Sequence, residues 1–132
     1  ILQMIDPKDF KEGELQAITE QLATFKDSRE DLTESITKYF IEFDEDKNGH
    51  LDQKELRHFL TLFFKQFHIH FPVTDEYVDA MFREIDTNHD NKIQPEELIE
   101  YASRFVGQLY QQYKTVLDQQ NNQAWVTNYL IT

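Results

Sequence analysis

Apolar side chains recur at steps of three and four residues along most of the chain, which is the pattern of amphipathic helices. The first such stripe consists of Leu15, Ile18, Leu22 and Phe25. Residues 1–14 precede it; they are mixed in charge and include Pro7 and Gly13, which favour turns. We therefore expect residues 1–29 to form a flexible lead-in and one amphipathic helix. This helix either caps the main domain or ends a connector from an upstream domain.

Four further apolar stripes flank two polar stretches, two stripes to each. They are Leu32, Ile36, Tyr39, Phe40 and Phe43; Leu56, Phe59, Leu60, Phe63, Phe64 and Phe67; Val78, Met81, Phe82 and Ile85; and Leu98, Tyr101, Ala102, Phe105, Leu109, Tyr113 and Val116. Ser28 or Asp31 can cap the first of these helices and Thr74 the third. Residues 68–73 break the apolar pattern after the second helix, and Pro72 is expected to stop that helix. The pattern predicts an all-α fold with an unusually long final helix.

The first polar stretch, residues 44–55, places oxygen-bearing side chains at regular intervals. Positions 1, 3, 5, 9 and 12 of DEDKNGHLDQKE are Asp44, Asp46, Asn48, Asp52 and Glu55. A hard cation of calcium's size takes about seven oxygens, and alternate residues of a tight turn can supply most of them. Gly49 at position 6 permits the positive φ of that turn, and His50 at position 7 offers its backbone carbonyl. This spacing is that of the EF-hand calcium loop.

The second polar stretch, residues 86–97, repeats this pattern with one departure. In DTNHDNKIQPEE the oxygen-bearing side chains at positions 1, 3, 5 and 12 are Asp86, Asn88, Asp90 and Glu97, and Lys92 at position 7 offers its carbonyl. Position 6 is Asn91 instead of glycine, and asparagine pays on the order of 1 kcal/mol for left-handed backbone. Pro95 falls in the first turn of the following helix, where no backbone donor is missed. We expect a working but somewhat penalised loop.

The two loops begin 42 residues apart, at Asp44 and Asp86, and their apolar flanks match position by position. Residues 30 to 106 resemble a calmodulin-like EF-hand pair, and the repeat spacing and long last helix are also similar to ciliate calcium-binding proteins of the Tetrahymena type. The resemblance implies one Ca²⁺ per loop. The implied ligands are Asp44, Asp46, Asn48, His50 (backbone), Asp52 and Glu55 in the first loop, and Asp86, Asn88, Asp90, Lys92 (backbone), Gln94 (through a water) and Glu97 in the second. Leu51 and Ile93, at position 8, are expected to pair as short strands.

Charge and composition narrow the classes of partner. Acidic residues number 25 against 13 basic ones, a net charge of −12, which opposes binding to nucleic acid or anionic lipid. Two calcium ions would leave a charge of about −8, so a basic amphipathic protein segment is the expected partner. The chain has no cysteine, which excludes disulfides and thiolate sites. No apolar run reaches the roughly 20 residues of a membrane span.

These features lead to an expected setting and to three candidate functions. We expect a monomeric, intracellular, cytoplasmic protein, with association with the cytoskeleton or cell cortex left open. Since residue 1 is Ile, the chain is interpreted as a fragment or processed product.

The favoured function is a calcium sensor that opens an aromatic-rich groove for a target; the alternatives are a calcium buffer that opens little and a structural subunit of a cytoskeletal assembly. No nucleophile motif or phosphate-binding glycine loop is present, so no enzyme is expected. The first loop is predicted to bind more tightly than the second, within about 10⁻⁷–10⁻⁵ M.

Two further segments carry open alternatives. His68 and His70 could share one face of the segment between the loops and bind zinc, although a surface pair is the simpler interpretation. We assign residues 30–118 to the paired domain and residues 119–132 to a polar linker, or a frayed helix end, and a short apolar tail. This tail, AWVTNYLIT, is a disordered or expression-derived end, a segment that folds back onto the domain's own groove, or a partner contact.

Overall fold

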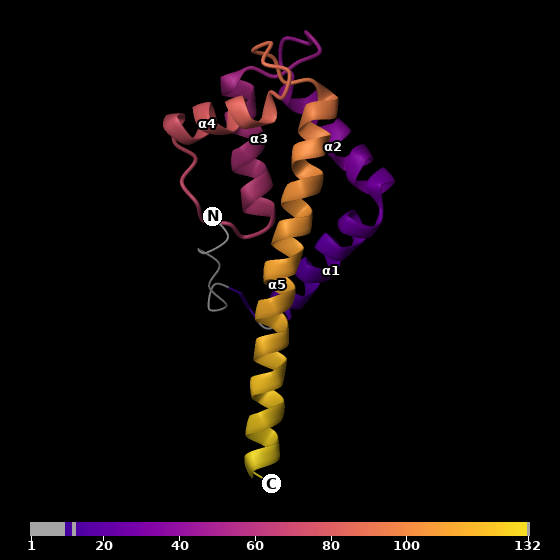
Figure 1. Ribbon diagram of the computed structural model, residues 1–132, viewed down its shortest axis with the longest axis vertical. Helices are drawn as coiled ribbons and strands as arrows, with labels where there is room; N and C mark the ends of the chain where they lie inside the picture. The colour runs from indigo at the N-terminus through magenta and orange to yellow at the C-terminus, as the bar shows by residue number, and fades with distance from the viewer. Residues whose placement is uncertain (1–9, 12, 132) are drawn as a thin grey trace.

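The computed structural model describes the backbone of residues 10, 11 and 13–131 and the side chains among them up to residue 119. Its helices are α1 (Glu14–Asp27), α2 (Arg29–Phe43), α3 (Gln53–Gln66), α4 (Asp75–Ile85) and α5 (Pro95–Ile131). Figure 1 shows the loops that follow α2 and α4 at one end of the molecule, with α5 running along its length. The predicted all-α class, with an extra first helix and a long last one, is confirmed.

Local side chains account for where α2, α3, α4 and α5 begin. The Ser28 hydroxyl accepts a hydrogen bond from the backbone of Asp31 at 3.2 Å, and the Thr74 hydroxyl accepts one from Tyr77 at 3.2 Å. Pro95 is the first residue of α5, as its missing N–H favours. These starts were predicted from sequence. Asp52 caps α3, which was not.

Helix α3 ends where the apolar pattern was expected to break, but Pro72 is not the residue that stops it. The helix stops at Gln66, well before Pro72, because His68 adopts a left-handed conformation with φ 57°. The backbone N–H of Ile69 then bonds to the Phe64 carbonyl at 2.9 Å and that of His68 to the Lys65 carbonyl at 3.2 Å. This is a Schellman closure, in which Phe64 and Ile69 are both buried. The sequence indicated the break at residues 68–73, but the stop was assigned to Pro72 because a left-handed histidine has no clear sequence signal.

The predicted apolar stripes meet in one core. Its buried members include Leu22, Ile36, Leu56, Phe59, Leu60, Phe64, Ile85, Leu98, Leu109 and Tyr113. Aromatic rings pack between α3 and α5. The centre of the Phe105 ring lies 5.4 Å from the centre of the Phe63 ring and 5.6 Å from that of the Phe64 ring. Helix α1 contributes Leu15, Ile18 and Leu22 to the same core and packs along α5. Of the two roles expected for this helix, capping the main domain is the one observed.

Helix α5 is longer than the sequence indicated. Its backbone continues to Ile131, through the residues interpreted as a polar linker and tail, and its last part extends past the other helices (Figure 1). The stretch from Gln119 to Gln123 contains neither glycine nor proline, and nothing in its backbone chemistry forces a break. The side chains of AWVTNYLIT lie outside the described residues, so the three alternatives for this tail stay predictions.

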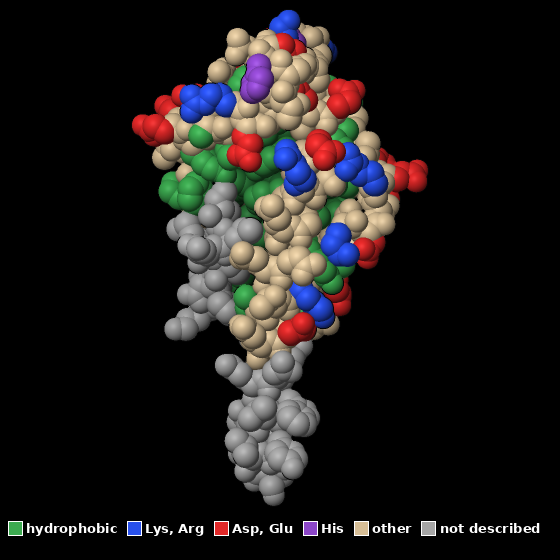
Figure 2. Space-filling view, in the orientation of Figure 1, with side chains coloured by type: hydrophobic (Ala, Val, Ile, Leu, Met, Phe, Trp, Pro, Cys, Tyr) green, Lys and Arg blue, Asp and Glu red, His purple; other side chains and the backbone are tan. Residues whose placement is uncertain are grey.

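The surface is mixed in charge. Figure 2 shows acidic and basic side chains interspersed over one face, with apolar side chains exposed near α4 and the segment that joins it to α3. No helix among the described residues is long and apolar enough to cross a membrane.

Candidate metal centre

Two groups of carboxylates come together at the loop end of the molecule. Asp44, Asp46 and Glu55 form one group, and Asp86, Asp90 and Glu97 form the other. Within each group, one carboxylate oxygen from every member lies within 4.8 Å of the others. Negative charges at this spacing repel one another unless a cation or protons neutralise them. Oxygen donors of this kind suit a hard divalent cation such as calcium.

Asp44 organises the turn of the first loop. Its Oδ1 accepts a hydrogen bond from the Asn48 backbone at 3.2 Å, and its Oδ2 accepts one from the Gly49 backbone at 2.9 Å. Gly49 has φ 86°, as its place at position 6 predicted. The Asn48 side chain accepts from the backbone of His50 at 3.1 Å, which fixes the next residue of the turn. The loop therefore wraps around the Asp44 carboxylate with its oxygens facing a common centre.

Glu55 links the entry and the exit of the first loop. This carboxylate is only 3% exposed. Its Oε2 accepts from the backbone of Glu45, just after α2, at 2.8 Å, and its Oε1 accepts from the backbone of Asp52 at 3.0 Å. Asp52 returns the bond by accepting from the Glu55 backbone at 2.8 Å, which completes a capping box for α3. The last predicted ligand of the loop is thus held in place from both sides.

The second loop repeats this turn around Asp86, which is 3% exposed. Its Oδ2 accepts from the Asn91 backbone at 2.8 Å and its Oδ1 from the Asp90 backbone at 3.3 Å. Asn91 is left-handed with φ 63°, as the sequence predicted. Glu97 accepts from the backbone of Gln94 at 3.0 Å and, less closely, from that of Asn88 at 3.4 Å.

Gln94 distinguishes the second loop from the first. Its amide Nε2 donates to Asp90 Oδ2 at 2.7 Å, and its carbonyl Oε1 is buried without a hydrogen-bond partner. The pKa of Asp90 lies below its ordinary value, first because of this bond from Gln94 and then because the Lys92 backbone also donates to the carboxylate. An unpaired buried oxygen is costly unless it finds a partner. Beside three clustered carboxylates, this one fits a site for a hard cation or the water bound to it.

The two loops are joined by one antiparallel bridge between Leu51 and Ile93. The Leu51 N–H donates to the Ile93 carbonyl at 2.9 Å, and the Ile93 N–H donates to the Leu51 carbonyl at 3.2 Å. Both side chains are 0% exposed. The predicted strand pairing at position 8 is confirmed as a single bridge.

Some features of the loops were not predicted from the sequence. Lys47 and His89, both at position 4, are left-handed with φ 54° and 56°. No glycine marks these positions, so only the repeat itself could have suggested that they share a conformation. The Thr87 hydroxyl donates to Glu97 Oε2 at 3.2 Å, a contact that the hydroxyl at position 2 could have signalled.

The structure gives no support to a zinc site at His68 and His70. His68 Nδ1 lies 3.1 Å from Glu14 Oε1, and the His68 ring stacks on Phe10 with the ring centres 5.3 Å apart. Neither histidine belongs to a group of three or more potential ligands among the described residues. His68 instead links α1 to the segment that follows α3.

The match to a known family covers both loops and most of the helical residues that flank them. The family described as an EF-hand domain pair matches residues 33–103, more than half of the chain. Both acidic groups and the bridge between them lie within the matched residues. The family is typically non-enzymatic, and its presence together with the acidic groups indicates calcium binding. The chain belongs to the EF-hand family.

Proposed function

We propose that the chain binds two calcium ions, one in each loop, and acts as a calcium sensor. The observation that carries the proposal is the pair of carboxylate groups, each of which joins the start of a loop to the first turn of the helix that follows it. Calcium would supply the positive charge that these groups lack. The ligands are the twelve residues expected from the resemblance, of which His50 and Lys92 act through their backbone carbonyls.

Glu55 and Glu97 are the residues that convert binding into motion. Each lies in the first turn of an exiting helix, α3 or α5, and each accepts hydrogen bonds from the preceding loop. When both oxygens of such a glutamate engage an ion, the exiting helix moves with them and the angle between the paired helices changes. Because the Leu51–Ile93 bridge joins the two loops, a conformational change in one loop would alter the conformation of the other.

The surface that such a motion would expose is aromatic. Phe59, Phe63 and Phe64 on α3 face the centre of the molecule, where the rings of Phe63 and Phe64 pack against Phe105 on α5. Separation of α3 from α5 would uncover these rings. Because the chain carries a net charge of −12, a basic amphipathic segment in the cytoplasm or at the cytoskeleton is the target that fits best.

One observation favours a buffer as the second candidate. Helix α1 already covers part of α5, with Leu15, Ile18 and Leu22 buried. A pair of hands that stays covered in this way would bind calcium with little change in exposed apolar surface, as buffers do.

Calorimetric titration of the full chain with calcium tests the binding itself. We expect two ions per chain. The double variant Glu55→Gln, Glu97→Gln should lose both, whereas Glu45→Gln, Glu96→Gln makes the same change of charge at exposed neighbours and should retain both. A wild-type stoichiometry of zero or one, or equal losses in the two double variants, would contradict the proposal.

A hydrophobic dye separates the sensor from the buffer. A sensor should bind more dye in calcium than in chelator, and Glu55→Gln should reduce that gain. Two bound ions without any gain in dye fluorescence would favour the buffer and would rule out the opening.

A further inference from the structure

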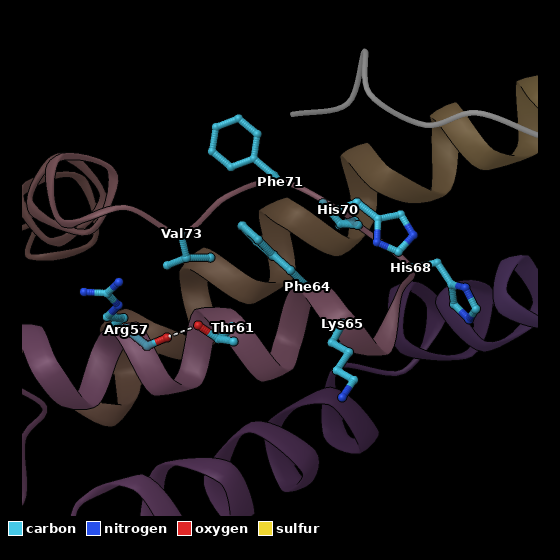
Figure 3. Close-up of a pocket in the computed structure, with 9 residues that line it drawn as sticks. Arg57, Thr61, Phe64, Lys65, His68, His70, Phe71 and Val73 are labelled. Atoms are coloured by element: carbon cyan, nitrogen blue, oxygen red, sulfur yellow. Dashed lines mark hydrogen bonds between the residues drawn. The ribbon is translucent and has the colours of Figure 1, made fainter. Parts of the chain in front are cut away.

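A groove lies on the side of α3, away from the carboxylate groups. It has a volume of about 830 Å³ and is lined by Arg57, Thr61, Phe64, Lys65, His68, Ile69, His70, Phe71 and Val73. The first four belong to α3, and the others belong to residues 67–74, which join α3 to α4. Figure 3 shows this joining segment passing along α3, with Phe64 rising between them. Its volume falls in the range of about 300–1,000 Å³ typical of ligand sites.

The left-handed turn at His68 creates the groove. It sends the chain back along the helix that it has just left, so the joining segment forms a second wall. Phe64 and Ile69 are buried at the base, and Phe71 is held by the ring of Tyr77, whose centre lies 4.7 Å away. Both walls are thus fixed to the core, and the groove is part of the fold.

The groove differs in charge from the rest of the chain. Among the described residues, its lining includes Arg57, Lys65 and two histidines but no acidic residue, although acidic residues outnumber basic ones 25 to 13 in the chain. Two carboxylates contact this lining from beside it, Asp75 at Arg57 and Glu14 at His68. Arg57 lies at one end beside Val73, and His70 lies at the other (Figure 3). Lys65 makes no ion pair with any described residue. An apolar base with a cationic rim is complementary to an anionic and apolar ligand.

Arg57 is already paired, and its partner can be exchanged. Its guanidinium contacts the carboxylate of Asp75, whose side chain is 83% exposed. An ion pair this open to water contributes little to stability, so a carboxylate arriving with a ligand could replace Asp75 at small cost. Arginine is well suited to this because it can bind a carboxylate through two parallel hydrogen bonds.

We propose that this groove docks a protein segment in which an acidic side chain stands next to a large apolar one. The apolar side chain would rest on Phe64, Ile69 and Val73, and the carboxylate would meet Arg57 or Lys65. This partner is opposite in charge to the basic target proposed for the calcium-dependent surface, so the two surfaces would recruit different segments. The open, elongated form of the groove between a helix and an extended stretch fits a peptide chain.

The test uses a short fluorescent peptide that alternates glutamate with phenylalanine and leucine, and a counterpart with lysine in place of glutamate. Anisotropy is measured on the full chain in calcium and in chelator, and variants are compared under whichever condition gives tighter binding. Arg57→Glu, Lys65→Glu should weaken binding of the acidic peptide at least about tenfold, because it turns attraction into repulsion. Lys38→Glu, Lys114→Glu makes the same change of charge on α2 and α5 and should leave binding within about twofold.

Chemical-shift mapping with the acidic peptide guards against an indirect effect. The expected shifts are at Thr61, Ile69 and Val73 on the two walls of the groove. Several results would overturn the proposal: equal weakening by both double variants, equal affinity for the lysine peptide, or shifts that map elsewhere. Binding of dodecyl phosphate but not of the peptide would assign the groove to a small amphipathic anion instead. Shifts that depend on protein concentration alone would assign it to a second copy of the chain. None of these results alters the number of calcium ions bound, so this proposal and the proposed function fail separately.

Discussion

The two loops follow one twelve-residue pattern but differ in their turn residues and in the hydrogen bonds and burial of their final glutamates. In the first, Gly49 makes the turn, Asp52 caps the following helix, and Glu55 accepts two backbone hydrogen bonds of 2.8 and 3.0 Å. In the second, Asn91 makes the turn under strain, and Gln94 at position 9 donates to Asp90. There the final glutamate accepts backbone bonds of 3.0 and 3.4 Å and is less buried.

This difference is a reason to expect different calcium affinities from two loops with one ligand pattern. Every group that must be ordered or displaced when the ion binds makes the binding free energy less favourable. Each loop has one amide to release from a carboxylate, that of Asn48 from Asp46 at 2.9 Å in the first loop and that of Gln94 from Asp90 at 2.7 Å in the second. The second loop must in addition tolerate left-handed Asn91, and its final glutamate accepts a longer backbone hydrogen bond. The tighter first site stays a prediction: the number of acidic ligands and the turn residue, Gly49 against Asn91, favour it from the sequence, and the greater burial and shorter hydrogen bonds of Glu55 agree with it.

The largest expected effect tests what the two loops share. Leu51→Ala and Ile93→Ala each remove a fully buried side chain from the bridge and should lower the free energy of unfolding by about 2–5 kcal/mol. Each variant should also weaken calcium binding at the opposite loop. Urea unfolding and site-resolved NMR titration measure the two effects. Leu62→Ala, at an exposed position of α3, should stay within about 0.5 kcal/mol. If each alanine affected only its own loop, the loops would be independent.

The next effect separates the two final glutamates. Glu55→Gln should weaken the first site at least about tenfold, since losing a charged hydrogen-bond partner costs about 1.5–3 kcal/mol. Glu97→Gln should cost its own site less, because Glu97 is less buried and its backbone bonds are longer. Titration followed at the Gly49 and Asn91 amides resolves the two sites. Equal losses, with Glu45→Gln unchanged as the control, would remove the proposed difference in preorganisation.

The sequence predicted the parts of the fold that periodicity and chemistry specify locally. Two loops of fixed spacing placed Asp44 and Asp86 at position 1 and the turns at Gly49 and Asn91, and the inward residues Leu51 and Ile93 predicted the bridge. Asn91 was expected to be left-handed because so few residue types tolerate that backbone.

The sequence could not predict features that depend on tertiary contacts. His68 is left-handed where the Ile69 N–H turns back to the Phe64 carbonyl and both side chains are buried, and the spacing of these residues gives no sign of that turn. The groove beside α3 follows from the same turn, so it was missed with it. Whether α1 capped the domain depended on its packing along α5, which an amphipathic pattern leaves open.

Exchange of the two turn residues tests the backbone contribution alone. A Cβ at Gly49 would meet no atom within 4 Å, so Gly49→Asn adds backbone strain without a clash. We expect it to weaken the first site by about 1 kcal/mol, roughly fivefold. Asn91→Gly should strengthen the second site by less, because glycine also loses more freedom on folding. The amide titrations should then show the affinities of the two loops drawing together. Gly107→Ala in α5 is the control, since it should leave both affinities unchanged.

The smallest expected effect concerns position 9, where Gln94→Asp would give the second loop the residue of the first. An aspartate there can accept from the Glu97 backbone, as Asp52 does from Glu55, and should stabilise the chain by about 0.5–1 kcal/mol in thermal unfolding.

The Gln94→Asp change also frees Asp90 from the amide that lowers its pKa, so that pKa should rise toward its ordinary value. A carboxyl with a lowered pKa contributes stability above its unfolded pKa and loses it as pH falls through the folded value. In the variant this contribution should be smaller and should vanish at a higher pH, which carboxyl NMR titration in chelator can follow. Asp52→Gln is the mirror change and should remove the cap of α3 and weaken the first site. If Gln94→Asp left both the Asp90 titration and the calcium affinity of the second site unchanged, the Gln94 amide would not be what lowers the affinity of that loop.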